Sequence, residues 1–149
     1  MDSRFMERAI SLAKKAYDNG EIPVGAVIVK DGVIIGEGFN MRESKKSVLS
    51  HAEIEAIDAA SKKLGDWRLS GATIYVTLEP CLMCAGAIAA GRIDEIVFGA
   101  YDLERGFVCS RADINALAGS NITIFGGIKE DECNTLLNRF FSEIRTKGE

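Results

Sequence analysis

The chain opens with apolar residues at helical spacing and then changes to short apolar runs of the strand type. Phe5, Met6, Ala9, Ile10, Leu12, Ala13, Ala16 and Tyr17 fall on one face of residues 1–19, with charged residues between them. This pattern predicts an amphipathic helix. Residues 26–29 and 33–39 are two apolar runs separated by Asp31-Gly32, a dipeptide typical of a two-residue hairpin turn. We therefore expect a helix followed by a β-hairpin.

Strand-like and helix-like segments alternate along the rest of the chain. Residues 41–49 are polar and are expected to form a loop. Further strands are predicted at 73–78, 95–99 and 122–125, and further helices from about His51 to Leu64, from Pro80 to about Gly91 and from about Lys129 to Arg145. Residues 110–113 resemble the capped start of a short helix within the long irregular stretch 101–120. This order favours an α/β fold with parallel strands and helices on both faces of the sheet.

Length and composition indicate a single domain spanning residues 1–149. The chain carries 18 basic and 22 acidic residues, a formal net charge of −4. A surface covered throughout by nucleic acid is therefore excluded, whereas a local basic patch is not. The apolar runs are shorter than the ~20 residues that cross a bilayer, and the first helix is not of the export type. We expect a cytoplasmic protein with no membrane segment.

Three residues have the spacing of metal ligands. Cys81 and Cys84 are three positions apart and share one helix face, and Pro80 suits the first position of that helix. Two thiolates on one face form half of a tetrahedral zinc site. His51, the one histidine of the sequence, lies 30 residues before Cys81 at another predicted helix start and can supply a third ligand. Cys109 and Cys133 have no ligand-like spacing and are expected to act as small hydrophobic side chains.

A site with three protein ligands keeps a position for water and is typical of catalytic zinc. Glu53, two residues after His51, is the candidate general acid/base. Each fragment alone has another interpretation. Ser50 to Glu53 also reads as a capping box, and Cys81 with Cys84 also reads as a redox dithiol. Glu55 shares the face of His51 but is expected to be solvated or ion-paired.

The two fragments together match a known signature. H-x-E followed by P-C-x-x-C marks the zinc-dependent nucleobase deaminases, and TadA-type enzymes are among the known examples. Nearly the whole chain resembles the bacterial tRNA adenosine deaminases of the TadA type, within the cytidine-deaminase-like superfamily. The resemblance is carried by residues 22–27, 36–40, 51–54, 75–88, 97–100, 131–133 and 140–141.

The resemblance implies a fold, a reaction and partners. The fold is a three-layer α/β/α sandwich with a five-stranded mixed sheet. The reaction is hydrolytic deamination of adenosine to inosine at the wobble position of a tRNA anticodon loop, with Zn²⁺ as the cofactor. His51, Cys81 and Cys84 would bind the zinc, and Glu53 would move the proton from water to the leaving ammonia. The family is also homodimeric, and the small residues at 85–91 would let another element approach closely, although they equally suit packing on the chain's own sheet.

The resemblance also assigns residues to the substrate. Asn40 would hydrogen-bond the flipped base, Val24 and Ala52 would contact it, Asp102 would lie near the flanking nucleotides, and Phe141 would wall the anticodon groove. Each has an ordinary structural alternative, such as a strand end for Asn40 or a core position for Val24. Basic residues available for the tRNA backbone gather in three clusters: Arg42, Lys45 and Lys46; Arg105 and Arg111; and Arg139, Arg145 and Lys147.

Two other functions fit parts of the pattern. A deaminase of a free base such as guanine or cytosine would use the same zinc chemistry with a different pocket. A non-catalytic, zinc-stabilised RNA-binding subunit would retain the metal ligands without the proton shuttle. Because Glu53 is present, the sequence favours an active enzyme.

Overall fold

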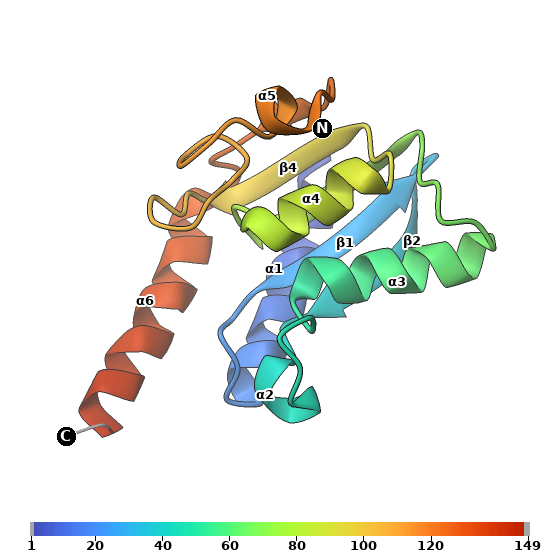
Figure 1. The fold of residues 1–149 in the computed structure, drawn as a ribbon. Helices are drawn as coiled ribbons and strands as arrows, with labels where there is room; N and C mark the ends of the chain where they lie inside the picture. The colour runs from blue at the N-terminus through green and yellow to red at the C-terminus, as the bar shows by residue number, and fades with distance from the viewer. Residues whose placement is uncertain (1, 148–149) are drawn as a thin grey trace.

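A five-stranded mixed sheet with helices on both faces forms the framework of this computed structural model, which describes residues 2–147 (Figure 1). The elements in chain order are α1 (Ser3–Asp18), β1 (Gly25–Lys30), β2 (Val33–Phe39), α2 (Arg42–Lys45), α3 (Ala52–Leu64), β3 (Ala72–Leu78), α4 (Leu82–Ala90), β4 (Glu95–Ala100), α5 (Ile114–Ala118), β5 (Thr123–Phe125) and α6 (Glu130–Lys147). The expected α/β class and three-layer sandwich are confirmed.

The strand order brings the ends of β2, β3 and β4 and the start of β1 to one edge of the sheet. The order is β2-β1-β3-β4-β5; β1 is antiparallel to β2 and β3, whereas β3, β4 and β5 run parallel. The carboxyl ends of β3 and β4 therefore meet the start of β1 and the end of β2. In α/β sheets, ligands bind beyond the carboxyl ends of the parallel strands. This edge is where we expect the functional site.

Two cores lie on opposite faces of the sheet. One contains residues of α3, α4 and α5, and the other contains residues of α1 and α6. Figure 1 shows α3 and α4 together on the same side of the sheet, with α1 on the other. The buried face of α3 consists mainly of alanines, including Ala52, Ala56 and Ala60. The helix can therefore approach the sheet closely.

Two glycines of β2 complete this close approach. A Cβ atom at Gly36 would collide with the carbonyl oxygen of Ala56, and one at Gly38 would collide with that of Ala52. A side chain at either position would push the first turns of α3 away from the sheet. These contacts fix the start of α3, and the start of α3 carries His51.

The predicted loop 41–49 contains one element that the sequence pattern does not show. Residues 42–45 form the short helix α2. The backbone N–H groups of Glu43 and Ser44 donate to the carboxylate of Glu21, at 3.0 and 2.7 Å. The Glu21 side chain is buried and comes from the connection between α1 and β1. A distant carboxylate thus supplies the cap, which local periodicity cannot reveal.

Two other predictions need correction: the start of α4 and the burial of Cys109. α4 begins at Leu82 with Cys81 as its N-cap, so Pro80 lies two residues before the helix rather than at its first position. Cys133 is buried as expected, but Cys109 is exposed and is not a core side chain. Within residues 2–147, none of the helices is both long and apolar enough to cross a membrane.

Candidate metal centre

The three predicted metal ligands meet where α3 and α4 begin. His51 is the N-cap of α3, Cys81 is the N-cap of α4, and Cys84 lies in the first turn of α4. The Nδ1 atom of His51 is 3.7 Å from the Sγ atom of Cys81 and 3.5 Å from that of Cys84. All three donor atoms lie within 4.8 Å of one another. The convergence expected from residues 30 positions apart in the sequence is confirmed.

Electrostatics prepare this cluster to bind a cation. A hydrogen bond from the Cys84 thiol, together with one from His51, lowers the pKa of Cys81 to about 3. The same thiol–thiolate contact and burial raise the pKa of Cys84 far above its usual range. Cys81 is therefore disposed to be a thiolate, whereas Cys84 keeps a proton that a bound divalent cation would displace. One imidazole and two thiolates are the donor set of a three-ligand zinc site, so these residues form a metal site typical of zinc deaminases.

Glu53 lies beside the metal ligands in the first turn of α3. The residue is only 4% exposed, and burial raises the pKa of its carboxyl to about 7. A carboxyl group with this pKa can both accept and release a proton at neutral pH. The Cys84 thiol is a hydrogen-bond partner of the same carboxyl. Glu53 therefore has the location and the protonation behaviour of an acid/base group.

The structure decides two of the alternative interpretations of this segment. His51, not Ser50, is the N-cap of α3, and no side chain caps the helix there. The capping-box interpretation is therefore wrong. The Glu55 carboxylate forms an ion pair with Lys45 at 2.9 Å, as expected for a residue that takes no part in the reaction. Of these two glutamates, Glu53 is the one that faces the ligand cluster.

A cavity of about 90 Å³ opens beside the ligands. Its walls come from the ends of β2 and β3, the starts of α3 and α4, and the segments that precede β1 and follow β4. The lining residues are Ile22, Val24, Asn40, Arg42, His51, Ala52, Glu53, Leu78, Glu79, Cys81, Asp102 and Arg105. The cavity thus joins the metal ligands and Glu53 to most of the expected substrate residues.

The expected substrate residues differ in how they are held. The amide of Asn40 is buried, with its nitrogen donating to the Ile22 carbonyl at 3.3 Å and its oxygen accepting from the Arg42 N–H at 3.3 Å. One carboxylate oxygen of Asp102 accepts from two backbone N–H groups of its own turn. Phe141 does not line the cavity. It is exposed on α6, with its ring centroid 5.6 Å from that of Phe140.

Sequence reasoning missed one charged residue in this region. Glu79 lies between the end of β3 and Pro80 and is almost completely buried. Its carboxylate accepts hydrogen bonds from residues 23 to 31 positions further along the chain. The sequence signal that could have revealed it is the place of an acidic residue directly after the apolar strand 73–78. Burial of such a charge requires hydrogen-bond partners.

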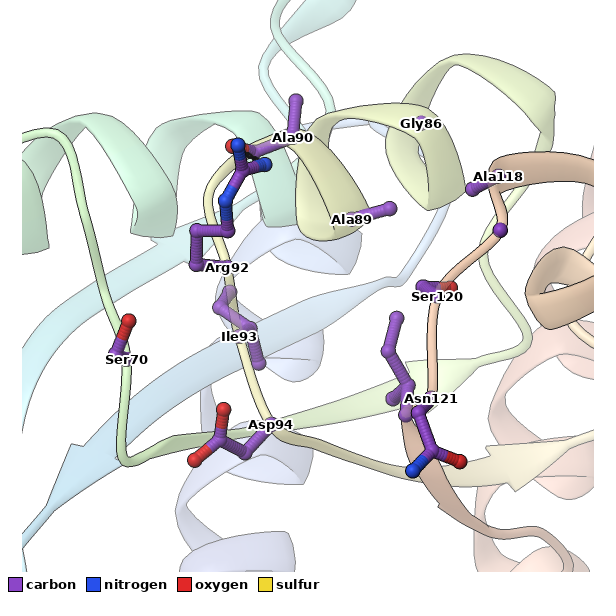
Figure 2. Close-up of a pocket in the computed structure, with 12 residues that line it drawn as sticks. Ser70, Gly86, Ala89, Ala90, Arg92, Ile93, Asp94, Ala118, Ser120 and Asn121 are labelled. Atoms are coloured by element: carbon purple, nitrogen blue, oxygen red, sulfur yellow. Dashed lines mark hydrogen bonds between the residues drawn. The ribbon is translucent and has the colours of Figure 1, made fainter.

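A larger cavity, about 710 Å³, lies elsewhere, between the end of α4 and the connection from α5 to β5 (Figure 2). Figure 2 shows Arg92 and Asp94 on one side and Ser120 and Asn121 on the other. The metal ligands and Glu53 do not line it. Its walls are mostly alanine, glycine and serine. Asp94 is the one carboxylate that lines it, and this side chain already accepts from the Gly71 N–H at 2.9 Å. The smaller cavity is the candidate active site.

Comparisons with known proteins agree with this geometry. Residues 1–142 match the MafB19-like deaminase family. A tRNA-specific adenosine deaminase of Bacillus subtilis (strain 168) is 46% identical over 150 residues, covering 98% of this chain and 92% of that protein. A structure from studies of A-to-I editing by tRNA:A34 deaminases at the wobble position superposes with a TM-score of 0.88 at 38% identity, covering 91% of this chain and 100% of that one.

A guanine deaminase structure from Bacillus subtilis is also similar, but over less of the molecule. It is 41% identical with a TM-score of 0.64, covering 68% of this chain and 66% of that one. The resemblance to the tRNA deaminases extends over nearly the full length. The chain therefore belongs to the MafB19-like deaminase family and, within it, to the tRNA-specific adenosine deaminases.

Proposed function

We propose that this protein deaminates adenosine to inosine at the wobble position of a tRNA anticodon loop, with zinc as its metal. The observation that carries the proposal is the His51–Cys81–Cys84 cluster with the buried Glu53 beside it, in a chain of this family. The reaction replaces the C6 amino group of adenine with oxygen from water and releases ammonia. A metal site and one acid/base group are sufficient for it.

The roles of the residues follow from their positions. His51, Cys81 and Cys84 would hold zinc, which supplies Lewis acidity that activates water for attack on C6. Glu53 takes a proton from that water and passes it towards the leaving ammonia. Burial raises the pKa of the Glu53 carboxyl to about 7, so this group can both take up and release a proton at neutral pH. His51, Cys81 and Cys84 would thus hold the metal, and Glu53 would carry the proton from water to ammonia.

The lining of the cavity suits a base that has left its stack. Asn40 offers an amide to the base edge, and Val24 and Ala52 provide an apolar wall. Turning a nucleotide out of a stack costs least in a single-stranded loop. Asp102 lines the same cavity and would contact a neighbouring nucleotide. Phe141 lies outside it and would meet more distant parts of the anticodon arm.

Substrate choice separates this proposal from the free-base alternative. The test incubates the zinc-loaded protein with an anticodon stem-loop that carries adenosine at the wobble position, and separately with guanine and with cytosine. We expect inosine in the RNA and no turnover of either free base. Turnover of guanine alone would overturn the proposal in favour of the guanine deaminase function that the similarity to the Bacillus subtilis structure raises.

Binding of the RNA backbone is expected to depend on cations at the mouth of the cavity. Arg42 and Arg105 both line it. We predict that Arg42→Gln weakens binding of all anticodon stem-loops to a similar degree and reduces the slope of log affinity against log salt by about 0.7, the loss of one phosphate contact to a single strand. Titrations at several salt concentrations measure this. Lys63→Gln, a neutralisation at the far end of α3, is the matched control and should leave the slope unchanged.

Arg139, the first residue of the third basic cluster (Arg139, Arg145 and Lys147), does not line the cavity. Arg139 lies on α6 and pairs with Glu143 at 3.4 Å. The side chains of Arg145 and Lys147 lie outside the residues whose side chains the structure describes. The arginines at the cavity are therefore the better targets for mutation.

We also propose that two copies of the chain associate through the face next to the metal site. Val48, Leu49 and Leu82 are between 58% and 71% exposed and flank the metal ligands in the sequence. In residues 85–91, Ala85 and Ile88 are buried on the sheet, whereas Gly86 and Ala90 are exposed, so part of this run remains available to another element. Analytical ultracentrifugation tests for the dimer. Because tRNA is the substrate and none of the four cysteines is in a disulfide, we place the protein in the cytoplasm.

A further inference from the structure

Glu79 binds a long segment of the chain to the end of β3. Its backbone N–H donates to the Ala100 carbonyl at 2.8 Å, which extends the pairing of β3 with β4. Its side chain is 2% exposed. A carboxylate buried to this degree needs donors for both oxygens, because an unpaired buried charge is strongly destabilising.

The donors all come from the segment 102–110. One carboxylate oxygen accepts from the backbone N–H of Asp102 at 3.2 Å and from the Ser110 hydroxyl. The other oxygen accepts from the backbone N–H groups of Val108, Cys109 and Ser110, at 3.2, 2.9 and 2.8 Å. Five donors thus surround one carboxylate, and four of them are backbone groups. The conformation of the segment is therefore determined largely by Glu79.

The packing around Gly106 shows how closely the segment fits this carboxylate. A Cβ atom at Gly106 would collide with the Glu79 carboxylate and with the carbonyl oxygen of Asp102. The Phe107 N–H also donates to the Pro80 carbonyl at 2.9 Å, so the residue after Glu79 holds the same segment. Glu79 and Pro80 directly precede Cys81. The two residues that precede the metal ligand Cys81 therefore also hold the segment 102–110, which forms one wall of the cavity beside the ligands.

That wall belongs to the cavity. Asp102 and Arg105 are the members of the segment that line it. Asp102 is held at its backbone by Glu79, and its own side chain then accepts from the N–H groups of Glu104 and Arg105 at 3.2 and 3.0 Å. The hydrogen bonds thus run in series from Glu79 to the turn that presents Arg105.

We propose that Glu79 is a positioning residue which, by holding residues 102–110, places Asp102 and Arg105 at the cavity mouth and so sets how tightly the RNA around the reacting adenosine binds. Glu79 does not touch the reacting atoms in this role. The inference rests on the proposed function, because it assigns the wall to RNA. It extends that function by naming the group that shapes the substrate-binding surface.

The test replaces the carboxylate with the amide of the same shape. In Glu79→Gln one oxygen becomes an NH₂ group, which faces backbone donors and cannot accept from them. We expect KM for an anticodon stem-loop to rise about tenfold or more, the equivalent of at least one hydrogen bond lost at the RNA surface, while zinc content stays at that of the wild type. We also expect faster amide hydrogen exchange across 102–110.

The matched control is Asp113→Asn. Asp113 is an exposed carboxylate that caps the N–H groups of Asn115 and Ala116 at the start of α5 and does not line the cavity. This variant should change KM less than twofold. If Glu79→Gln folds poorly, Gly106→Ala disturbs the same wall without removing the carboxylate, and the same rise in KM is expected.

A double-mutant comparison shows whether Glu79 acts through its segment. In a protein that carries Asp102→Ala and Arg105→Ala, adding Glu79→Gln should raise KM by much less than tenfold. Three outcomes would overturn the inference: an unchanged KM in Glu79→Gln, loss of zinc with that variant, or a full tenfold effect in the double-alanine background. Absence of inosine with the wild type would instead overturn the proposed function, and the exchange of residues 102–110 would still report on Glu79.

Discussion

Glu53→Gln is expected to lower kcat for inosine formation by about 10³-fold or more while the protein stays folded and metal-loaded. The amide has the size of the carboxyl but can neither take nor release the proton, and positioned acid/base groups contribute about 10² to 10⁴ in rate. Because Glu53 is buried beside the ligands without being one of them, its replacement should spare the metal. Single-turnover assays on the stem-loop, together with metal analysis and thermal unfolding, measure the three properties.

Glu55→Gln is the control for this variant. It makes the same chemical change on the same helix, but Glu55 is ion-paired with Lys45 and does not line the cavity. Its activity should remain within about twofold of the wild type, since surface ion pairs contribute little. If Glu53→Gln kept wild-type turnover, Glu53 would have no part in proton transfer. The protein would then need another acid/base group.

Cys84→Ala is expected to abolish both zinc binding and activity. Removal of one of three ligands leaves too few donors for a stable site, and the remaining thiolate and imidazole cannot close the coordination. The variant should also lose the stabilisation that zinc gives the folded wild type, about 4 kcal/mol when free zinc is 1,000 times its dissociation constant. Metal content, turnover and unfolding temperature with and without added zinc provide the measurements.

Cys109 provides a control for the Cys84 variant. Cys109→Ser changes an exposed thiol that has no place in the ligand cluster, so zinc content and unfolding temperature should match the wild type. A chelator should bring the wild type to the unfolding temperature of Cys84→Ala and have no further effect on that variant. Zinc retained at one equivalent in Cys84→Ala would show that the cluster is not the metal site.

The sequence predicts those features whose cause is local. The amphipathic spacing of residues 5–17 gives α1, and the hairpin dipeptide Asp31-Gly32 gives the β1–β2 turn. The metal ligands could also be predicted, because each is marked by its place at a helix start. Helix α2 and the surroundings of Glu79 could not, because their hydrogen bonds join residues more than 20 positions apart. Periodicity carries no information about which distant backbone group a carboxylate will accept from.

The substrate residues show the same limit. Asn40, Val24, Ala52 and Asp102 come from four segments that only the strand order brings together. Their roles in the sequence came from resemblance, whereas their common position at one cavity comes from the antiparallel start of β1 beside the parallel end of β3. The role of Phe141 is also implied only by the resemblance, and this residue lies on α6, which packs on the face of the sheet opposite α3 and α4.

The metal ligands and the cavity walls are supported in different ways. His51, Cys81 and Cys84 lie at the starts of helices packed on the sheet, whereas Arg42 and Arg105 lie in segments held mainly by the carboxylates of Glu21 and Glu79. Chemistry and selectivity are therefore separable in this architecture. Replacing residues 42–45 and 102–110 while Glu21 and Glu79 are retained should change which RNA surrounds the reacting adenosine and leave the reaction centre intact, which makes the scaffold a starting point for engineering new editing specificities.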